Sequence, residues 1–183
     1  MKRVWLLPLL LFVACSSPDK DAKVDAVGPS IGPDDAQNRF WLVADAMVYT
    51  CGTLDCHGNN YRNMRLYGYG GLRSSNVASD VFFQDRYAVA YPDEVKKDYD
   101  AIIGLEPTIM NDVVRDNGAA PERLVLIRKG RALENHKGGP VMKPGDPIDD
   151  CITSWLASNV RVDRCEKVVT DPLGAKAIPP GTP

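Results

Sequence analysis

The sequence contains no apolar run long enough to cross a membrane. Its longest apolar stretch, residues 4–14, is interrupted by Pro8 and is shorter than the about 20 residues that a membrane-spanning helix needs. Lys2 and Arg3 precede this stretch, which gives the charged start and short apolar segment of an export signal. The sequence therefore predicts an exported protein without a spanning helix.

Basic residues are not in excess. The 183 residues include 22 Lys and Arg against 24 Asp and Glu, and removal of Lys2 and Arg3 with the export signal makes the balance more acidic. Proteins that bind nucleic acids usually carry a concentrated basic face, so we expect no nucleic-acid partner. A hydrophobic content of 44% is sufficient for one domain with a core of ordinary size.

Cysteine is scarce, and the first of the five lies directly after the apolar stretch. Residues 12–17 read Phe-Val-Ala-Cys-Ser-Ser and resemble the lipobox of bacterial lipoproteins. The resemblance implies a signal peptide over residues 1–14, lipidation of Cys15, and anchoring in the cell envelope without a spanning helix. Ser16 favours the outer membrane, with the protein facing the periplasm or the surface. An ordinary signal peptide, cleaved after Ala14, is the alternative.

Composition divides the remaining chain into three parts. Residues 15–33 are polar and predict a flexible tether that follows the lipidated cysteine. Residues 34–167 predict one globular domain, and residues 168–183, rich in proline and glycine, predict a disordered tail. The membrane, reached through the lipid anchor, is therefore an expected partner.

Apolar periodicity and capping residues predict a mostly α-helical domain with long loops. Helices are expected wherever apolar residues recur at helical spacing after a proline or an acidic start: residues 34–50, 91–104, 106–118 and 146–156. The short apolar run at residues 124–127 predicts a buried strand or extended segment, and the glycine- and tyrosine-rich residues 58–73 predict a loop.

Histidine is the scarcest chemically active residue, since the chain has only two. Residues 51–58 read Cys-Gly-Thr-Leu-Asp-Cys-His-Gly, so His57 directly follows the second of two cysteines. Covalent haem attachment uses two thiols and an adjacent imidazole in the pattern Cys-x-x-Cys-His; here the spacer has four residues instead of two. The same pair, Cys51 and Cys56, is also suited to a local disulfide.

Four cysteines remain after Cys15, and in an exported protein an even set is expected to pair. Three pairings are open, of which the most local joins Cys51 to Cys56 and Cys151 to Cys165. Haem attachment consumes the first pair as thioethers and leaves the Cys151–Cys165 disulfide alone. That disulfide closes a loop of about 15 residues, which corresponds to roughly 3 kcal/mol in the chain-entropy model.

A longer pattern carries a family resemblance. The Cys-x4-Cys-His-Gly run is followed by Lys129, by residues 136–139, His-Lys-Gly-Gly, and by a helix that ends in Trp155-Leu156. This pattern resembles the small cytochrome-c-like domains of exported planctomycete and myxobacterial proteins. It is also similar to uncharacterised myxobacterial lipoproteins with the same eight-residue run.

The resemblance implies a small cytochrome-c-like helical domain, stapled by a disulfide, that carries one haem c. Cys51 and Cys56 would bind the haem covalently, His57 would be the proximal iron ligand, and His136 a distal ligand or pocket residue. The expected function is single-electron transfer at the envelope with a redox protein partner. No substrate bond is broken, so the protein is not expected to be an enzyme.

Other interpretations of the same residues remain open. The main alternative is a haem-less structural or binding lipoprotein, stabilised by two disulfides. Zinc bound by two thiolates and two imidazoles is a second alternative. For the sixth iron ligand, the thioethers of Met64, Met110 and Met142 compete with His136. The basic cluster between Arg123 and Lys143 predicts a solvated face, a site for haem carboxylates, or a dock for an acidic partner.

Overall fold

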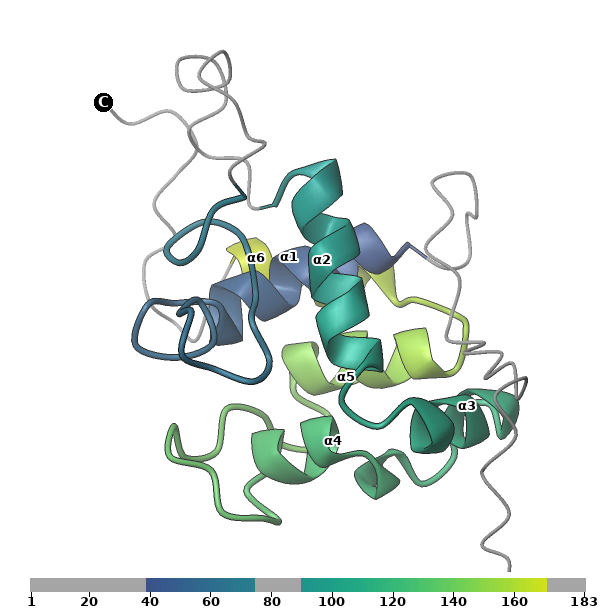
Figure 1. Cartoon of the computed structure of the whole chain (residues 1–183). Coiled ribbons are helices and arrows are strands. Elements are labelled where there is room, and N and C mark those ends of the chain that lie inside the picture. The colour runs from purple at the N-terminus through teal and green to yellow at the C-terminus, as the bar shows by residue number, and fades with distance from the viewer. Residues whose placement is uncertain (1–38, 75–89, 171–183) are drawn as a thin grey trace, which may run out of the picture.

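The computed structural model describes residues 39–74 and 90–170 (Figure 1). This part of the chain is mostly α-helical, as predicted, and contains no strand beyond one isolated bridge between Tyr67 and Leu72. The elements follow in the order α1 (Phe40–Cys51), α2 (Pro92–Ile103), α3 (Pro107–Arg115), the short 3-10 helix η1 (Pro121–Arg123), α4 (Val125–Gly130), α5 (Pro147–Leu156) and α6 (Val162–Thr170).

Proline marks the start of three of the predicted helices. Helices α2, α3 and α5 each begin with proline at the first position, where the missing N–H costs nothing and the fixed φ suits a helix. Gly118, the predicted stop after α3, has a φ of +76° and donates its N–H to Val113 O. These three helices are confirmed. Helix α1 ends at Cys51, near the predicted position, while its predicted acidic start lies outside the described residues.

Helix α1 forms the centre of the hydrophobic core. It packs against α2, α5 and α6, and it lies behind α2 in Figure 1. Phe40 and Trp155 are fully buried, with ring centroids 5.0 Å apart. Trp41, which the periodicity assigned to the apolar stripe, is instead half exposed. The buried positions of α1 spread around the helix because neighbours cover it on more than one side: Phe40, Leu42, Val43, Ala44, Ala46, Met47 and Val48.

The prediction of a strand at residues 124–127 is wrong. Leu124 is extended, but Val125 begins helix α4, and the backbone N–H of Val125 donates to the Glu106 carboxylate. Ile127 and Gly130 are its buried members. A four-residue apolar run has no period of its own, so periodicity cannot distinguish a buried strand from a short buried helix.

The predicted disulfide between Cys151 and Cys165 is present, with an S–S distance of 1.99 Å. It joins α5 to α6, a helix that was not predicted from the sequence. Val168 of α6 is buried and the helix continues to Thr170, so the packed fold extends three residues beyond the predicted domain end at residue 167. The apolar positions of α6 are few, which is why the helix escaped detection.

The predicted loop after α1 is confirmed, and buried carboxylates attach it to α2. The Tyr67 N–H donates to Asp98 over 2.7 Å and the Ser74 N–H donates to Glu94 over 2.8 Å. Arg73 also forms an ion pair with Glu94 at 3.2 Å. Both acidic side chains are fully buried, so α2 supplies the acceptors that hold an otherwise irregular segment in place.

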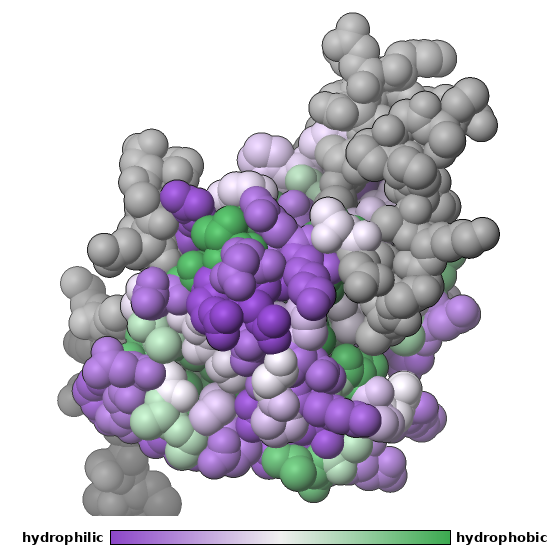
Figure 2. Space-filling view, turned by 180° about the vertical axis from the view of Figure 1, so that it is seen from behind, coloured by the Kyte–Doolittle hydropathy of each residue, from purple (hydrophilic) through white to green (hydrophobic). Residues whose placement is uncertain are grey.

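In the part of the chain that the structure describes, no helix is long and apolar enough to span a membrane. Figure 2 shows the face behind the view of Figure 1, where hydrophilic side chains predominate and apolar patches are small. Few large apolar side chains are exposed in the described residues: Trp41, Leu54, Tyr61 and Leu133.

Candidate functional site

The run of residues 51–58 forms a compact turn at the end of α1. Cys51 is the last residue of the helix, and its carbonyl accepts the His57 N–H over 2.8 Å. The Thr53 carbonyl accepts from both Cys56 and Gly58 at 2.9 Å. The four-residue spacer is therefore a closed turn that returns His57 to the helix end.

Three glycines allow this turn to pack against the following loop. A Cβ atom on Gly58 or on Gly71 would collide with the carbonyl oxygen of Gly52. Only backbones without side chains can approach so closely. The glycine that follows His57 in the sequence motif therefore has a packing reason. Gly71 shares that role, although nothing in the local sequence pattern distinguishes it from its neighbour Gly70.

The imidazole of His57 is held by a backbone carbonyl. Its Nδ1 lies 3.0 Å from Met64 O, and because a carbonyl can only accept, Nδ1 carries the proton. Burial lowers the pKa of His57 below its ordinary value, against the opposing effect of this hydrogen bond. The neutral ring, with an unprotonated Nε2, is the form that binds metals.

His136 lies in the segment between α4 and α5 and is held in the same way. Its Nδ1 lies 2.9 Å from Gly139 O, and the residue that supplies this carbonyl has a φ of +71°, which favours glycine. Gly138 lies directly beside the ring, since a Cβ there would be 3.2 Å from Cε1. The His-x-Gly-Gly pattern is thus a tight turn that orients one imidazole.

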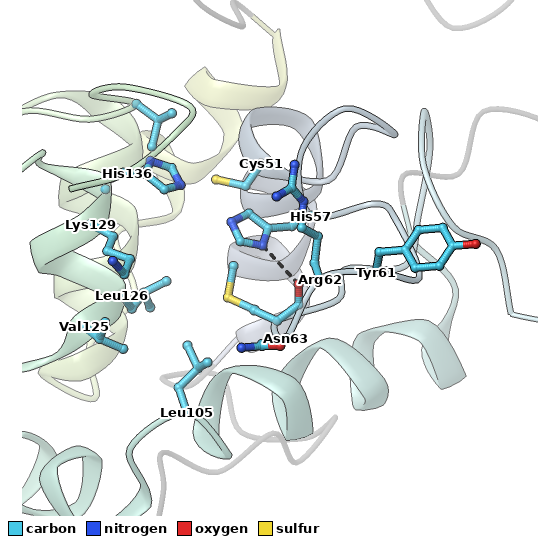
Figure 3. Close-up of a pocket in the computed structure, with 13 residues that line it drawn as sticks. Cys51, His57, Tyr61, Arg62, Asn63, Leu105, Val125, Leu126, Lys129 and His136 are labelled. Atoms are coloured by element: carbon cyan, nitrogen blue, oxygen red, sulfur yellow. Dashed lines mark hydrogen bonds between the residues drawn. The ribbon is translucent and has the colours of Figure 1, made fainter. Parts of the chain in front are cut away.

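The structure brings the two histidines together, although they are far apart in the sequence. Their ring centroids are 6.0 Å apart and their planes differ by 12°. Figure 3 shows the rings turned toward one another across a pocket, with the Nδ1–Met64 hydrogen bond of His57 on the side away from His136. Within the described part of the chain, neither Nε2 has a hydrogen-bond partner.

Two adjoining cavities, which we call together the histidine pocket, surround this pair. The larger cavity has a volume of about 420 Å³ and the smaller about 290 Å³. Cys51 lines the larger cavity and Cys56 the smaller, so each cavity receives one of the two thiols from the turn. Most of the apolar lining of the larger cavity was not predicted from the sequence: Leu105, Val125, Leu126 and Val141. No local signal marks these residues, because they come from separate segments.

Cys51 and Cys56 are both free thiols in the structure. Burial raises the pKa of the Cys51 thiol to about 12, with a smaller contribution from Cys56. A thiol that stays protonated is not an activated nucleophile. No cluster of three or more His, Cys, Asp or Glu side chains in residues 39–74 and 90–170 is arranged to hold a metal ion.

The three methionines considered as iron ligands lie in different places. Met64 lines the larger cavity, and its carbonyl accepts the hydrogen bond from His57. Met110 belongs to the core cluster. Met142 packs so tightly on α4 that a side chain at Gly130 would collide with it.

Most of the predicted basic cluster is committed to ion pairs. Arg128 contacts Glu106 at 3.3 Å and Glu134 at 3.0 Å, and Arg131 binds Asp149 through both carboxylate oxygens. These arginines join α4 to its neighbours and are not a uniformly solvated face. Lys129 also pairs with Glu134, at 3.0 Å, and lines the histidine pocket together with Lys137.

Comparisons with known proteins add no family assignment. No family model, curated protein or solved structure matches the chain. The functional assignment therefore depends on the geometry of the histidine pocket and on the chemistry of the residues that line it.

Proposed function

We propose that the chain is a lipid-anchored, cytochrome-c-like protein that binds one haem c in the histidine pocket and transfers single electrons at the cell envelope. The observation that carries the proposal is the pair of facing imidazoles, each with Nδ1 bound to a carbonyl and Nε2 left for a metal. Metal-bound histidines characteristically donate their second N–H to such a partner, which fixes the tautomer and the ring orientation.

The residues that line the histidine pocket fit a haem group. A metal–imidazole bond measures about 2 Å; two such bonds, with the ring radius added at each end, come close to the 6.0 Å between the centroids. Because a porphyrin supplies four nitrogens, only two protein ligands are needed, His57 and His136. The cavity volumes of about 420 and 290 Å³ are typical of small-molecule sites, which occupy about 300–1,000 Å³.

The two cysteines line this site from the turn that carries His57. Each thiol of Cys51 and Cys56 would add across one vinyl group: sulfur bonds to one vinyl carbon and the thiol hydrogen goes to the other. The addition is redox-neutral and needs no oxidant. Their free thiols support this role, since a disulfide between them would prevent both additions.

When bound, haem iron supplies a one-electron redox couple, with a potential set by its axial ligands and by burial. The chain's own part is to fix both imidazoles through Met64 O and Gly139 O and to surround the macrocycle with apolar side chains. Anchoring through Cys15, which lies outside the described residues, would place this couple at the envelope, where a redox protein partner could reach it.

The first test is an absorption spectrum and an intact mass of the full chain, exported in a host that matures c-type cytochromes and purified in detergent. We expect a haem Soret band, a mass heavier by one haem, and recovery from the membrane fraction. His57→Ala should abolish the Soret band, and His136→Ala should weaken or shift it. Asn159→Ala is the matched control, because it shortens an exposed polar side chain that lines neither cavity.

The cysteines are tested in the same preparation. Cys51→Ser/Cys56→Ser should keep the Soret band but release the haem on extraction with acidified acetone, because only the covalent bonds are lost. A colourless parent protein, lighter than the reduced chain by the hydrogens of two disulfides, would contradict the proposal. It would instead support the haem-less, disulfide-stabilised lipoprotein, for which the closeness of the two thiols in the turn is the favouring observation.

A further inference from the structure

Two cations lie where the cavities of the histidine pocket meet. Four residues line both cavities: His57, Arg62, Lys129 and His136. Arg62 comes from the loop after α1 and Lys129 from α4, so each histidine is accompanied by a cation from its own side of the pocket. Figure 3 shows both cationic side chains beside the facing rings.

The two cavities differ in chemistry. The larger one is lined mainly by apolar side chains, whereas the smaller one has none beyond Cys56 and is lined by polar and charged groups. Lys137 adds a third cation to the smaller cavity, and Asp55 is the only carboxylate among the described residues that line either cavity. The apolar side chains therefore lie on the side of the larger cavity, and the cations lie at the junction and on the side of the smaller cavity.

The positive charge at the cationic end is only partly neutralised. Arg62 donates to the backbone carbonyls of Asp55 and Cys56, both over 3.0 Å, and has no ion pair in the part of the chain that the structure describes. Lys129 binds Asn135 O over 2.9 Å and Glu134 over 3.0 Å. Glu134 also pairs with Arg128 at 3.0 Å, so Lys129 shares its carboxylate, and Arg62 and Lys137 have none among the described residues. Cations that lack a full counter-ion in a cavity are suited to an anionic ligand.

From this arrangement we propose that Arg62 and Lys129, assisted by Lys137, bind the two carboxylates of an iron porphyrin and so set its orientation in the pocket. The proposal rests on the haem function proposed above. Iron protoporphyrin is an apolar disc with two carboxylates on one edge. The apolar cavity matches the disc and the cationic cavity matches that edge, and charge-assisted hydrogen bonds make such contacts strong and directional.

The test compares two porphyrins that differ only in this edge. The full chain with Cys51→Ala/Cys56→Ala, prepared without haem in detergent, is titrated with haemin and with haemin dimethyl ester while the Soret band is followed. In this parent we expect haemin to bind about tenfold more tightly than the ester, as for loss of a hydrogen bond to a charged group. Adding Arg62→Gln/Lys129→Gln should reduce the ratio to about twofold or less.

A matched control carries the same change of charge elsewhere. Arg115→Gln/Lys96→Gln removes one arginine and one lysine from exposed ion pairs on α3 and α2, which line neither cavity. This variant should keep the tenfold ratio. An unchanged ratio in the Arg62/Lys129 variant, or an equal loss in the control, would overturn the proposal.

Failure of the haem function is distinguishable from failure of this inference. If the parent binds neither porphyrin, both proposals fail. If it binds both equally, haem binding stands and the carboxylate site is overturned. Arg62 also holds the turn before His57, so its replacement could disturb the fold. Lys137→Gln is therefore a second variant. Lys137 has no ion pair in residues 39–74 and 90–170, so its replacement should leave the fold intact. Lys137→Gln should partly lower the ratio of haemin affinity to ester affinity. An unchanged ratio would show that Lys137 does not bind a carboxylate.

Discussion

Helices α1, α5 and α6 pack through continuous apolar surfaces, whereas the two histidines of the pocket are held by isolated hydrogen bonds, each within its own loop. In the helical core, Phe40 and Trp155 are fully buried and contact one another, and the Cys151–Cys165 disulfide adds a covalent link. In the pocket, His57 and His136 are each fixed by a single carbonyl.

The difference separates what stabilises the protein from what binds the ligand. Burial of apolar area contributes free energy in proportion to the area and tolerates small shifts, so the core can weaken without losing its arrangement. A ligand pair must keep its geometry within a fraction of an ångström, so the pocket depends on a few close contacts. Substitutions in the two regions should therefore give different signatures.

The largest loss of stability is expected from Trp155→Ala in the core. The side chain is fully buried between Phe40 and Tyr99, and loss of such a ring costs about 3–5 kcal/mol. Urea denaturation should show this loss, while the Soret band of the protein that remains folded keeps its position.

The matched control is Trp155→Phe. It keeps an aromatic ring against Phe40 and removes an indole N–H that has no partner among the described residues. We expect it to cost much less than the alanine variant. Equal losses for the two variants would contradict the assignment of this stability to ring burial.

Gly71→Ala should have a smaller effect on stability and a larger one on the site. Its new methyl group would collide with Gly52 O, and such overpacking costs about 1–3 kcal/mol. Relief of the collision would displace the turn that carries His57, so haem binding should fall while the far-ultraviolet circular dichroism of the helices is retained.

Gly70→Ala is the neighbouring control. Gly70 also has a positive φ, +82°, but a Cβ there meets nothing within 4 Å. It should show only the cost of an unfavourable backbone conformation, about 1 kcal/mol, with unchanged haem binding. If Gly70→Ala weakened haem binding as much as Gly71→Ala, close packing of the turn would not be the cause.

The last contrast lies at the boundary between the two regions, where Asp98 of α2 holds the loop. Burial raises the pKa of Asp98 to about 8, although its hydrogen bond from Tyr67 opposes the shift and Glu94 and Asp45 add to it. Burial likewise raises the pKa of Asp45 to about 7. The folded state thus binds these protons more tightly than the unfolded state does.

Stability should therefore fall as the pH rises from about 4 to about 8. Each carboxyl that is protonated in the folded state and ionised in the unfolded state contributes to this fall. Asp98→Asn, which retains an oxygen for Tyr67, should reduce that dependence in urea titrations between pH 5 and 9. Asp100→Asn, exposed on the same helix, should leave it unchanged. A parent whose stability rises over this range would contradict the assignment.

Helices with their own start signals could be predicted from the sequence. Pro92, Pro107 and Pro147 mark their helices, because proline at the first position reflects a purely local constraint. Helix α4 was predicted as a strand and α6 was not predicted. The N-terminus of α4 is completed by Glu106 from another segment, and α6 is held by a disulfide and by burial, neither of which leaves a local period.

The pocket could be predicted only in part. His57 and His136 could be predicted as site residues because the chain has no other histidines. Leu105 and Val141 could not, since aliphatic residues that line a cavity have the same sequence signature as those that fill a core. Arg62 was missed for a similar reason: an arginine in a polar loop is ordinary until its neighbours are known.

The sequence by itself indicated the mostly helical fold, favoured the Cys151–Cys165 pairing as the most local one, and marked the two histidines, because helix capping, closeness in the chain and residue chemistry are local properties. Only the tertiary structure decided that this disulfide forms while Cys51 and Cys56 stay free, that His57 and His136 face one another and that cations lie at the junction of the two cavities. The last two features join segments distant in the chain, and their positions follow from backbone contacts that any local pattern leaves open.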